Sequence, residues 1–225
     1  MRPDLFLAVL CAAGLFFGAR FALTVDRVRV EGAAAVSGRD VIKRIGMSPG
    51  GAGVLLLPGA ASRSLKKDRW IKNVSVKRDF RGGAVITIEE KKPFCLSVAS
   101  DGRLRYLDSD GGDLGPAPVA AHGTDYPVVR APAGFESEGT RVLTLSSSAR
   151  SAPRWDDISE VAVLGGDGFE IFTRRGLKVE LPGSDLDGQW EKLEKISRNL
   201  YEIGLKAAYI NLRRDGVGFV RPGGN

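Results

Sequence analysis

Residues 69–93 leave few folds open to this chain, because their sequence, RWIKNVSVKRDFRGGAVITIEEKKP, alternates between apolar and polar side chains. Val74 and Val76 alternate with polar residues before the paired glycines 82–83, and Ile86 and Ile88 do so after them. A period of two gathers apolar side chains on one face of a strand, and the glycines suit a tight turn. The stretch therefore predicts a β-hairpin whose apolar face needs a cover.

The segment before the hairpin predicts a third strand and a first helix. "DRVRVEG" (26–32) alternates like a half-buried strand, with Val28 and Val30 on one face. Ser37 then offers a helix N-cap for "GRDVIKRIG" (38–46), which closes on a glycine. Together they add one strand and one helix to the hairpin.

A second short helix is expected over Ala60–Lys67, with Leu65 facing inward. The glycine-rich segment between the helices (47–59) lacks the GK[ST] of a phosphate-binding loop and has no preceding strand, so a plain loop is the better interpretation. The order strand-helix-helix-strand-strand requires both helices to pack on the one apolar face of a three-stranded sheet. It predicts a small α+β unit.

The N-terminus carries 15 residues without a charge, Leu5–Ala19, and the apolar character continues to Val25. As a helix, residues 5–25 would reach about 31 Å, one hydrocarbon thickness. This predicts a retained single membrane span. The alternative is a cleaved signal peptide with Arg2 as its basic region, although no clean A-x-A cleavage site follows. Basic residues after the span leave its orientation open, since long downstream domains weaken the charge rule.

The net charge of +6 is matched by one segment, residues 63–81. Eight basic residues there oppose Asp68 and Asp79: Arg63, Lys66, Lys67, Arg69, Lys72, Lys77, Arg78 and Arg81. A solvated helix-and-hairpin face accounts for such a patch, and so does a surface for nucleic acid or anionic lipid. For nucleic acid the patch lacks interleaved aromatics, because Trp70 and Phe80 are better interpreted as core.

The residues that catalysis or metal binding needs are scarce. The chain has one histidine, two distant cysteines (Cys11 and Cys95) and no G-x-S-x-G, and Glu89 and Glu90 are strand neighbours that point to opposite faces. The spacing of three aspartates matches the start of a calcium-binding loop: Asp108, Asp110 and Asp113. The twelfth position of such a loop needs a Glu, but here it is Val119. We therefore expect no catalytic site, no metal site and no cofactor.

Residues beyond 93 predict a second, β-rich domain. Strands are expected within 94–113, at "YPVVR" (126–130), and at "ISEVAVL", "GFEIFT" and "LKVEL", while residues 116–154 otherwise lack periodicity. The clearest helix lies within 184–204, where Trp190, Leu193, Ile196 and Leu200 share a face. Two closing strands follow, "AAYINLR" and "VGFV" (217–220).

The predicted order of elements just after the membrane anchor, strand-helix-helix-strand-strand, resembles a POTRA domain. The amino-acid sequence of the hairpin resembles that of the FtsQ/DivIB family of bacterial cell-division proteins. The residues at the positions of the family motif are Trp70, Ile71, Val74, Val76, Arg78, Ile86, Ile88, Glu90 and Pro93. Arg81 stands where the family usually has a turn proline. Leu107–Gly111 and Tyr209–Arg214 resemble two further family stretches, with Arg214 in place of a partner-facing tyrosine.

The resemblance implies an anchor (1–25), a POTRA domain (26–93) and an FtsQ-type β domain (94–225). It implies a non-enzymatic scaffold in the inner membrane, single-pass type II, with both domains in the periplasm at the division septum. Such a scaffold links early and late division proteins and holds an FtsB–FtsL-like pair by strand addition at its C-terminal edge. The partner-binding residues would be Tyr209, Arg213, Arg214, Val217, Gly218, Phe219 and Val220, with no nucleic acid or small-molecule substrate.

An alternative is a POTRA-containing component of outer-membrane assembly or secretion that acts as a periplasmic binding module. Such chains carry several POTRA repeats and a long membrane barrel. This sequence shows one unit, no internal repeat and too few residues for a barrel.

Overall fold

The computed structural model describes residues 13–14, 24–25, 27–46, 54–55, 57–78, 83–99, 101–117, 125–213 and 218–223. The chain divides into two compact units, Met1–Lys91 and Lys92–Asn225. This division falls two residues before the end of the expected POTRA domain.

The expected membrane span lies almost wholly outside the described residues. At its end, Thr24–Val25 forms strand β1, so the predicted helix does not extend to Val25. Among the helices that are described, none has both the length and the apolar character that crossing a bilayer requires.

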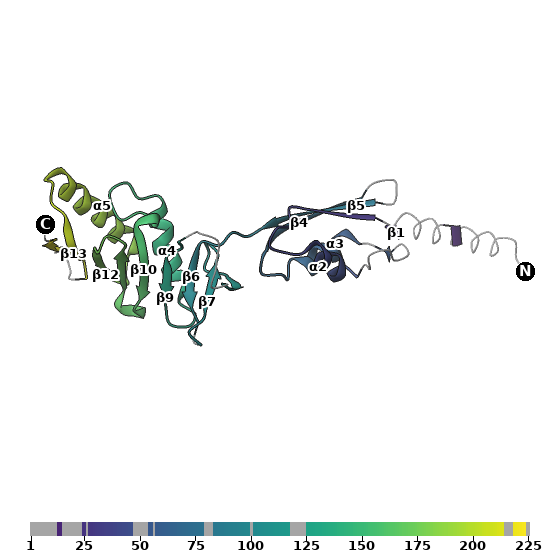
Figure 1. Ribbon diagram of the computed structural model, residues 1–225, viewed down its shortest axis with the longest axis horizontal. Coiled ribbons are helices and arrows are strands. Elements are labelled where there is room, and N and C mark those ends of the chain that lie inside the picture. The colour runs from purple at the N-terminus through teal and green to yellow at the C-terminus, as the bar shows by residue number, and fades with distance from the viewer. Residues whose placement is uncertain are drawn as a thin grey trace, which may run out of the picture. The chain divides into compact units, whose positions relative to one another are not determined.

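The first unit is built on a sheet of three described strands, called the small sheet, in the order β2-β5-β4. β2 is Arg27–Glu31, β4 is Ile71–Arg78 and β5 is Gly83–Glu90. The central β5 runs antiparallel to β4 and parallel to β2. Helices α2 (Gly38–Arg44) and α3 (Pro58–Leu65) lie on one side of this sheet (Figure 1). The predicted α+β arrangement is confirmed.

Local sequence explains where the two helices begin and end. The Ser37 side chain accepts a hydrogen bond from the Arg39 N–H, and Gly46 takes a φ of +79°, which favours glycine. α3 begins two residues earlier than expected because Pro58 occupies the first helical turn, where its missing N–H costs nothing. One part of the predicted plain loop was wrong: Val54–Leu55 forms strand β3, which pairs with β1.

The core of the first unit is the apolar face that the alternation predicted. Ile86 and Ile88 of β5 are buried, and Val74 and Val76 of β4 are half-buried beside them. Val41 of α2 and Leu65 of α3 are fully buried against this face. At about 25 cal/mol per Å² of apolar surface, burial of these side chains is what holds the helices on the sheet.

The second unit is built on a sheet of nine described strands, called the large sheet, in the order β14-β13-β12-β11-β10-β9-β6-β7-β8. From one edge its strands are β8 (Asp113–Pro116), β7 (Leu104–Leu107), β6 (Cys95–Val98), β9 (Val128–Arg130), β10 (Ile158–Val163), β11 (Phe169–Thr173), β12 (Lys178–Leu181), β13 (Ala207–Asn211) and β14 (Phe219–Pro222). Short 3₁₀ turns η1 (Trp155–Asp157) and η2 (Gly165–Asp167) precede β10 and β11. The strands predicted within 94–113 and 158–181 are confirmed.

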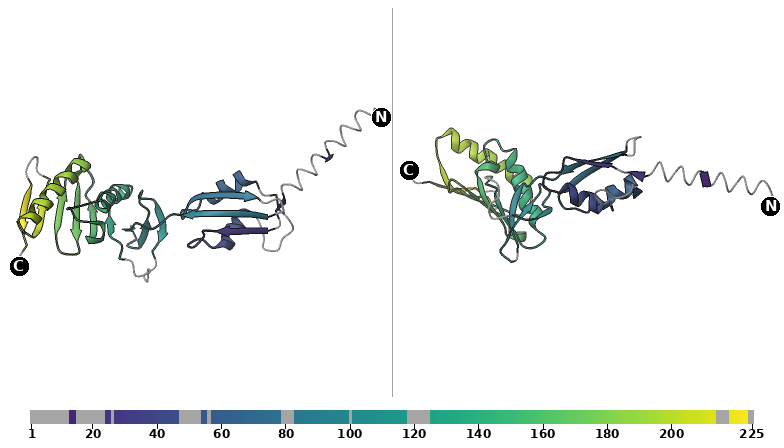
Figure 2. Two further views of the ribbon diagram at one scale, coloured as in Figure 1. Left: turned by 90° about the horizontal axis from the view of Figure 1, so that it is seen from above. Right: turned by 45° about the vertical axis from the view of Figure 1, so that its right-hand side comes forward.

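Two helices cover one face of the large sheet, α4 (Glu136–Ser147) and α5 (Leu186–Glu202) (Figure 2). The apolar row beneath them runs straight across five strands through Val129, Val161, Ile171, Val179 and Ile210, all fully or nearly fully buried. Because laterally paired residues point to the same face, this row sets the register of the sheet. The predicted helix within 184–204 is α5, with Trp190 and Leu193 buried.

Helix α4 was not predicted. Phe135 at its N-cap makes no capping hydrogen bond through its side chain, and the helix carries several Ser and Thr residues, which form helices poorly. Gly139 further weakens the local signal, but a Cβ there would lie 2.4 Å from Val129 Cγ1. A glycine is therefore required for close packing on β9, against its own low helix propensity.

Candidate functional site

Strand β14 forms one edge of the large sheet. It follows β13 in the strand order, and all four of its residues are exposed, including Phe219 at 46% and Val220 at 36%. The strand begins at Phe219, so Gly218 lies outside it, and Val217 of the predicted strand lies outside the described residues. An exposed edge strand presents backbone N–H and C=O groups with which another chain can pair.

A hydrogen bond just after β14 indicates which backbone groups of the strand face outward. The Gly223 N–H donates to the Lys206 carbonyl across a distance of 2.8 Å. Since alternate residues of an antiparallel strand bond to the same neighbour, Val220 directs its N–H and C=O away from β13. Pro222 also lies on the outward side and has no N–H, so it limits pairing at that end.

The side chains of the edge divide between the two faces of the sheet. Val220 is paired with Ile210, so it continues the apolar row toward the edge. Phe219 is paired with Asn211, and Arg221 is paired with Tyr209, both on the opposite face. The Arg221 guanidinium lies 5.7 Å from the centroid of the Tyr209 ring, a cation–π contact. A segment beside β14 would thus meet an apolar side chain on one face and an aromatic-basic pair on the other.

Behind the edge, the face of the large sheet opposite its helices carries a paired polar cluster. Lys178 Nζ lies 2.8 Å from Glu170 and 2.9 Å from Glu180. Asn211 donates to Glu180 Oε2 at 2.8 Å and to the Tyr209 hydroxyl at 2.6 Å. Burial alone would raise the pKa of Glu180, but hydrogen bonds from Lys178 and Tyr209 lower it on balance, while hydrogen bonds to Glu170 and Glu180 raise the pKa of Lys178. The cluster joins β11, β12 and β13.

The structure brings several of the predicted partner-binding residues together on β13 and β14. Tyr209, Phe219 and Val220 lie on the two neighbouring strands, and the Arg213 N–H donates to Asn211 Oδ1 just after β13. A Cβ at Gly218 would lie 3.0 Å from Ile196 Cδ1 and from Leu212 Cδ2, so this glycine allows a close approach. The two other predicted residues, Arg214 and Val217, lie outside the described residues.

Sequence reasoning missed Arg221, Lys178 and Glu180 at this edge. The pattern in "LKVEL" placed Lys178 and Glu180 on the outward face of a strand, which gave no sign that they pair. Arg221 follows the stretch that was predicted as the last strand. Its only signal was a position opposite a tyrosine, which becomes apparent once the register is known.

The motif residues of the small sheet hold its loops in place. The Glu90 carboxylate accepts backbone hydrogen bonds from Ala34, Ala35 and Val36, at distances of 2.9–3.0 Å. Glu89 points away and pairs with Lys72 at 2.8 Å. The two neighbouring carboxylates therefore serve different purposes, because adjacent strand residues face opposite sides.

The other motif residues lie in or beside the core of the first unit. Ile71, Ile86 and Ile88 are buried, and the side chains packed around them include Trp70, Val74 and Val76. Arg78 ends β4 and is half-buried. Pro93 is the exception, because it lies just inside the second unit, which begins at Lys92.

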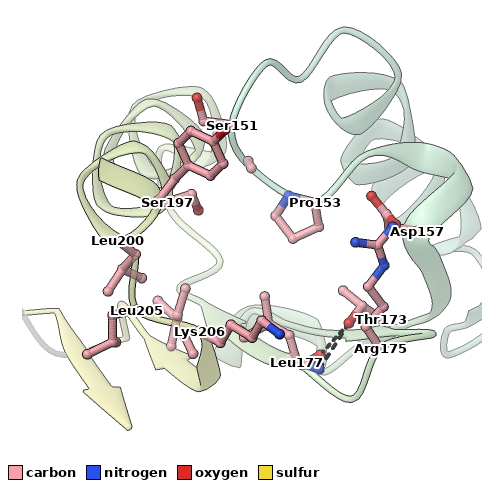
Figure 3. Close-up of a pocket in the computed structure, with 14 residues that line it drawn as sticks. Ser151, Pro153, Asp157, Thr173, Arg175, Leu177, Ser197, Leu200, Leu205 and Lys206 are labelled. Carbon is pink, nitrogen blue, oxygen red and sulfur yellow. Dashed lines mark hydrogen bonds and ion pairs between the residues drawn. The ribbon is translucent and has the colours of Figure 1, made fainter. Parts of the chain in front are cut away.

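A pocket of about 500 Å³ lies in the second unit between the end of α5, residues 151–157 and the β11–β12 turn (Figure 3). On one wall, Arg175 lies 3.4 Å from Asp157, and the Thr173 hydroxyl accepts from the Leu177 N–H at 3.0 Å. Its lining includes Lys206 but offers no histidine or cysteine and no second carboxylate. These residues do not assemble a nucleophile with a base or a pair of acids.

Two further sequence candidates are explained by local structure. The buried Asp108 side chain accepts hydrogen bonds from the N–H groups of Asp110 and Gly112, which is turn chemistry. Burial, and then the charge of Asp108, raises the pKa of the Cys95 thiol to about 12, so this thiol is unreactive in the folded protein. Among the described residues, no group of His, Cys, Asp and Glu has the arrangement of a metal site.

Comparison with known proteins follows the same division into two units. Residues 23–91 match the family model for the POTRA domain, FtsQ-type, and residues 98–213 match the model for the cell division protein FtsQ/DivIB, C-terminal. The chain is 28% identical over 226 residues to the cell division protein FtsQ of Geobacter sp. (strain M21), covering 91% of this chain and 81% of that protein. It is 25% identical over 204 residues to FtsQ of Anaeromyxobacter sp. (strain K), covering 84% and 67%.

These matches and the two folded units define a protein with a POTRA domain followed by an FtsQ-type β-rich domain. The chain belongs to the FtsQ/DivIB family of cell division proteins. The resemblance carried by the hairpin and by the C-terminal stretch is confirmed.

Proposed function

We propose that this chain is a non-enzymatic scaffold of the division machinery, which links early and late division proteins by holding an FtsB–FtsL-like pair at β14. The observation that carries the proposal is the open, exposed edge of the large sheet, where Val220 turns its backbone N–H and C=O outward. A partner segment would add a further strand there, with affinity from main-chain hydrogen bonds. The side chains described around the edge supply selectivity.

Charge around the edge favours a partner segment with acidic residues. Arg221 lies on the exposed strand β14, and Arg213 follows β13, the strand with which β14 pairs. Glu170 and Glu180 share the single positive charge of Lys178, so this group offsets only one of the two positive charges of Arg213 and Arg221. Electrostatic complementarity of this kind sets partner choice and association rate more than affinity.

We also propose that residues 1–25 anchor the chain in the inner membrane as a single type II span, with both units in the periplasm at the septum. The apolar run of residues 5–25 and the family supply the support. A reporter enzyme that is active only outside the cytoplasm, fused after Asn225, should then be active. Recovery of a soluble product that lacks the first ~20 residues would favour the signal peptide.

The alternative role in outer-membrane assembly is disfavoured because residues 98–213 match a domain particular to the FtsQ/DivIB family. That match leaves the division function as the proposal to test.

The decisive experiment replaces a single outward-facing N–H. Val220→Pro removes a donor from the outer side of β14 and obstructs pairing, whereas Val220→Thr keeps the N–H and the β-branched shape. We expect the full-length proline variant to lose most of its recovery of the FtsB–FtsL-like pair in a pull-down from membranes. The threonine variant should bind like the parent.

Thermal unfolding of each variant separates lost binding from lost fold. Val220 contributes no buried side chain, so both variants should melt close to the parent. Equal recovery of the pair by the proline variant and the parent would sink the strand-addition mechanism.

A further inference from the structure

The uncovered face of the small sheet carries a basic cluster at one end. Arg29 and Lys77 are both paired with Val85, so the three residues form a row across β2, β5 and β4. Arg27 lies two residues before Arg29 and on the same face. The three basic side chains are exposed, whereas the helices cover the opposite face of this sheet. We call Arg27, Arg29 and Lys77 the basic end.

Charge along this face is strongly uneven. At the other end of the same strands lie Glu31 and Glu89, and the basic residue there, Lys72, is paired with Glu89 at 2.8 Å. Between the two ends the face carries the neutral pair Ser75 and Thr87. The acidic and basic residues of the sheet face are thus separated along the strand direction.

Within the described part of the chain, Arg29 and Lys77 make no ion pair. The segments that flank the basic end, 26–29 and 77–82, carry five basic and two acidic residues in total. A net positive charge therefore remains at this end of the unit whatever pairs form locally. The exposed cations of Arg29 and Lys77 therefore favour association with an external anionic surface.

The position of the basic end in the chain indicates which surface that is. β2 begins at Arg27, four residues after residue 23, which is the last residue before strand β1. Four extended residues span at most about 14 Å, and the headgroup layer takes up about 5–7 Å of that beyond the hydrocarbon. The remaining distance is about one Debye length of about 8 Å at physiological salt. If the run is anchored as proposed above, the basic end lies within electrostatic range of lipid headgroups.

We propose that the basic end of the small sheet binds the anionic phospholipid headgroups of the membrane surface beside the anchor. The interaction would hold the first unit against the bilayer and restrict its tilt. A flat sheet face with dispersed cations suits a surface of many mobile anions better than a single small ligand, which needs converging donors in a pocket. This inference rests on the proposed membrane anchor but not on the proposed partner edge.

A fluorescence experiment on the full-length protein tests it. The chain with Ser75→Cys carries a donor dye on the exposed sheet face, in a Cys11→Ala background, and Cys95 is buried and resists labelling. The protein is reconstituted into vesicles of phosphatidylcholine, alone or mixed with phosphatidylglycerol, that contain a headgroup acceptor dye. We expect energy transfer to rise with phosphatidylglycerol and to fall again at high salt.

The variants Arg29→Gln with Lys77→Gln, and Arg29→Glu with Lys77→Glu, should remove this dependence on phosphatidylglycerol. Each cation near an anionic surface contributes about a fivefold factor, so the Gln pair should weaken docking more than about tenfold. The double variant Lys66→Glu with Lys67→Glu is the control matched to the Glu pair, because it makes the same charge change as that pair at exposed positions after α3. The control should keep the dependence on phosphatidylglycerol.

The outcomes distinguish this proposal from the others. Equal energy transfer in both vesicle types, or an equal loss in the Lys66/Lys67 control, would overturn it. Loss of FtsB–FtsL-like recovery in the Gln pair with unchanged lipid dependence would instead assign the basic end to a protein partner. If alkaline buffer extracts the chain from membranes, the chain is not anchored by a membrane span. That result would overturn the lipid proposal but would not affect the proposal that a partner binds at the β14 edge.

Discussion

The two sheets of this protein differ in how completely the charges on their uncovered faces are paired. On the large sheet, Lys178 is held between Glu170 and Glu180, and Arg130 is bonded to Glu160 across β9 and β10. On the small sheet, Arg29 and Lys77 flank Val85 and make no ion pair within the described residues. Charges that pair across strands fix register, whereas charges left over are available to an external surface. The chain thus carries one sheet face whose charges hold strands together and another on which two cations stay exposed.

In one respect the two units use the same device. Glu90 accepts hydrogen bonds from three consecutive N–H groups, at residues 34–36, and Glu194 of α5 accepts from three at residues 150–152. Each carboxylate satisfies backbone donors that a turn would otherwise leave without partners. Each thereby fastens a loop to a strand or helix far away in the sequence.

The largest expected effect is on the independence of the two units. Ile88→Asp places a charge among the buried residues of the first unit and should cost several kcal/mol, enough to unfold that unit. Ser75→Asp, on the exposed face of the same sheet, should leave it folded. Calorimetry should show one of two transitions lost in Ile88→Asp, and loss of both transitions would show that the units fold as one.

Next in size is the effect of neutralising the two glutamates. Glu90→Gln should lower the free energy of unfolding of the first unit by about 1–3 kcal/mol, because the hydrogen bonds from three N–H groups lose the negative charge and one of the two acceptor oxygens. Glu194→Gln should do the same to the second unit. Denaturant unfolding measures both, and Glu89→Gln is the control, since Glu89 makes an exposed pair worth less than about 1 kcal/mol.

A smaller effect is expected when paired and unpaired cations are exchanged for a neutral side chain. Lys178→Gln should destabilise the second unit by about 1 kcal/mol, because two acids lose their common partner. Arg29→Gln should leave the first unit as stable as the parent. Urea midpoints of the two variants test this, and a loss of stability in Arg29→Gln would show that its charge is structural.

The ion pairs of Lys178 with Glu170 and Glu180 predict that the stability of the second unit falls at both high and low pH. Because the pKa of Lys178 is raised, Lys178 contributes fully to the stability of the second unit at any pH below the ordinary pKa of 10.5. This contribution is lost as pH rises through the pKa of the folded state. Because the pKa of Glu180 is lowered, Glu180 contributes to the stability of the second unit above the ordinary pKa of 4.5. This contribution is lost as pH falls through the pKa of the folded state. In Lys178→Gln both slopes should flatten.

The last effect appears only at alkaline pH and concerns Cys95, which reports on the second unit. Its thiol pKa is raised from 9.0 to about 12, so the folded state keeps the proton where the unfolded state has lost it. The second unit should therefore lose stability as pH rises from about 9 to 12. In a Cys11→Ala background, alkylation at neutral pH should be negligible until the second unit unfolds. Fast alkylation of the Ile88→Asp variant would show that unfolding had spread from the first unit.

The small sheet was predictable from the sequence because its signals are local. Alternation in β4 and β5, a serine N-cap and terminal glycines all agree over short distances. Helix α4 was missed because its glycine and hydroxyl residues reflect packing against β9, a contact that the local pattern does not contain. The open edge at β14 was expected from the family resemblance, while the Lys178 cluster and Arg221 depend on register between strands that are distant in sequence.

Strand β14 contributes no residue to the buried core of the second unit, and it is attached through its pairing with β13. Its amide hydrogens should therefore exchange with solvent far faster than those of β10 and β11, whose side chains are fully buried. A partner strand on its outer side would turn this edge into an interior strand. Hydrogen exchange at Val220 would then slow on binding, and the ordering of the edge and the capture of the partner would be one thermodynamic event.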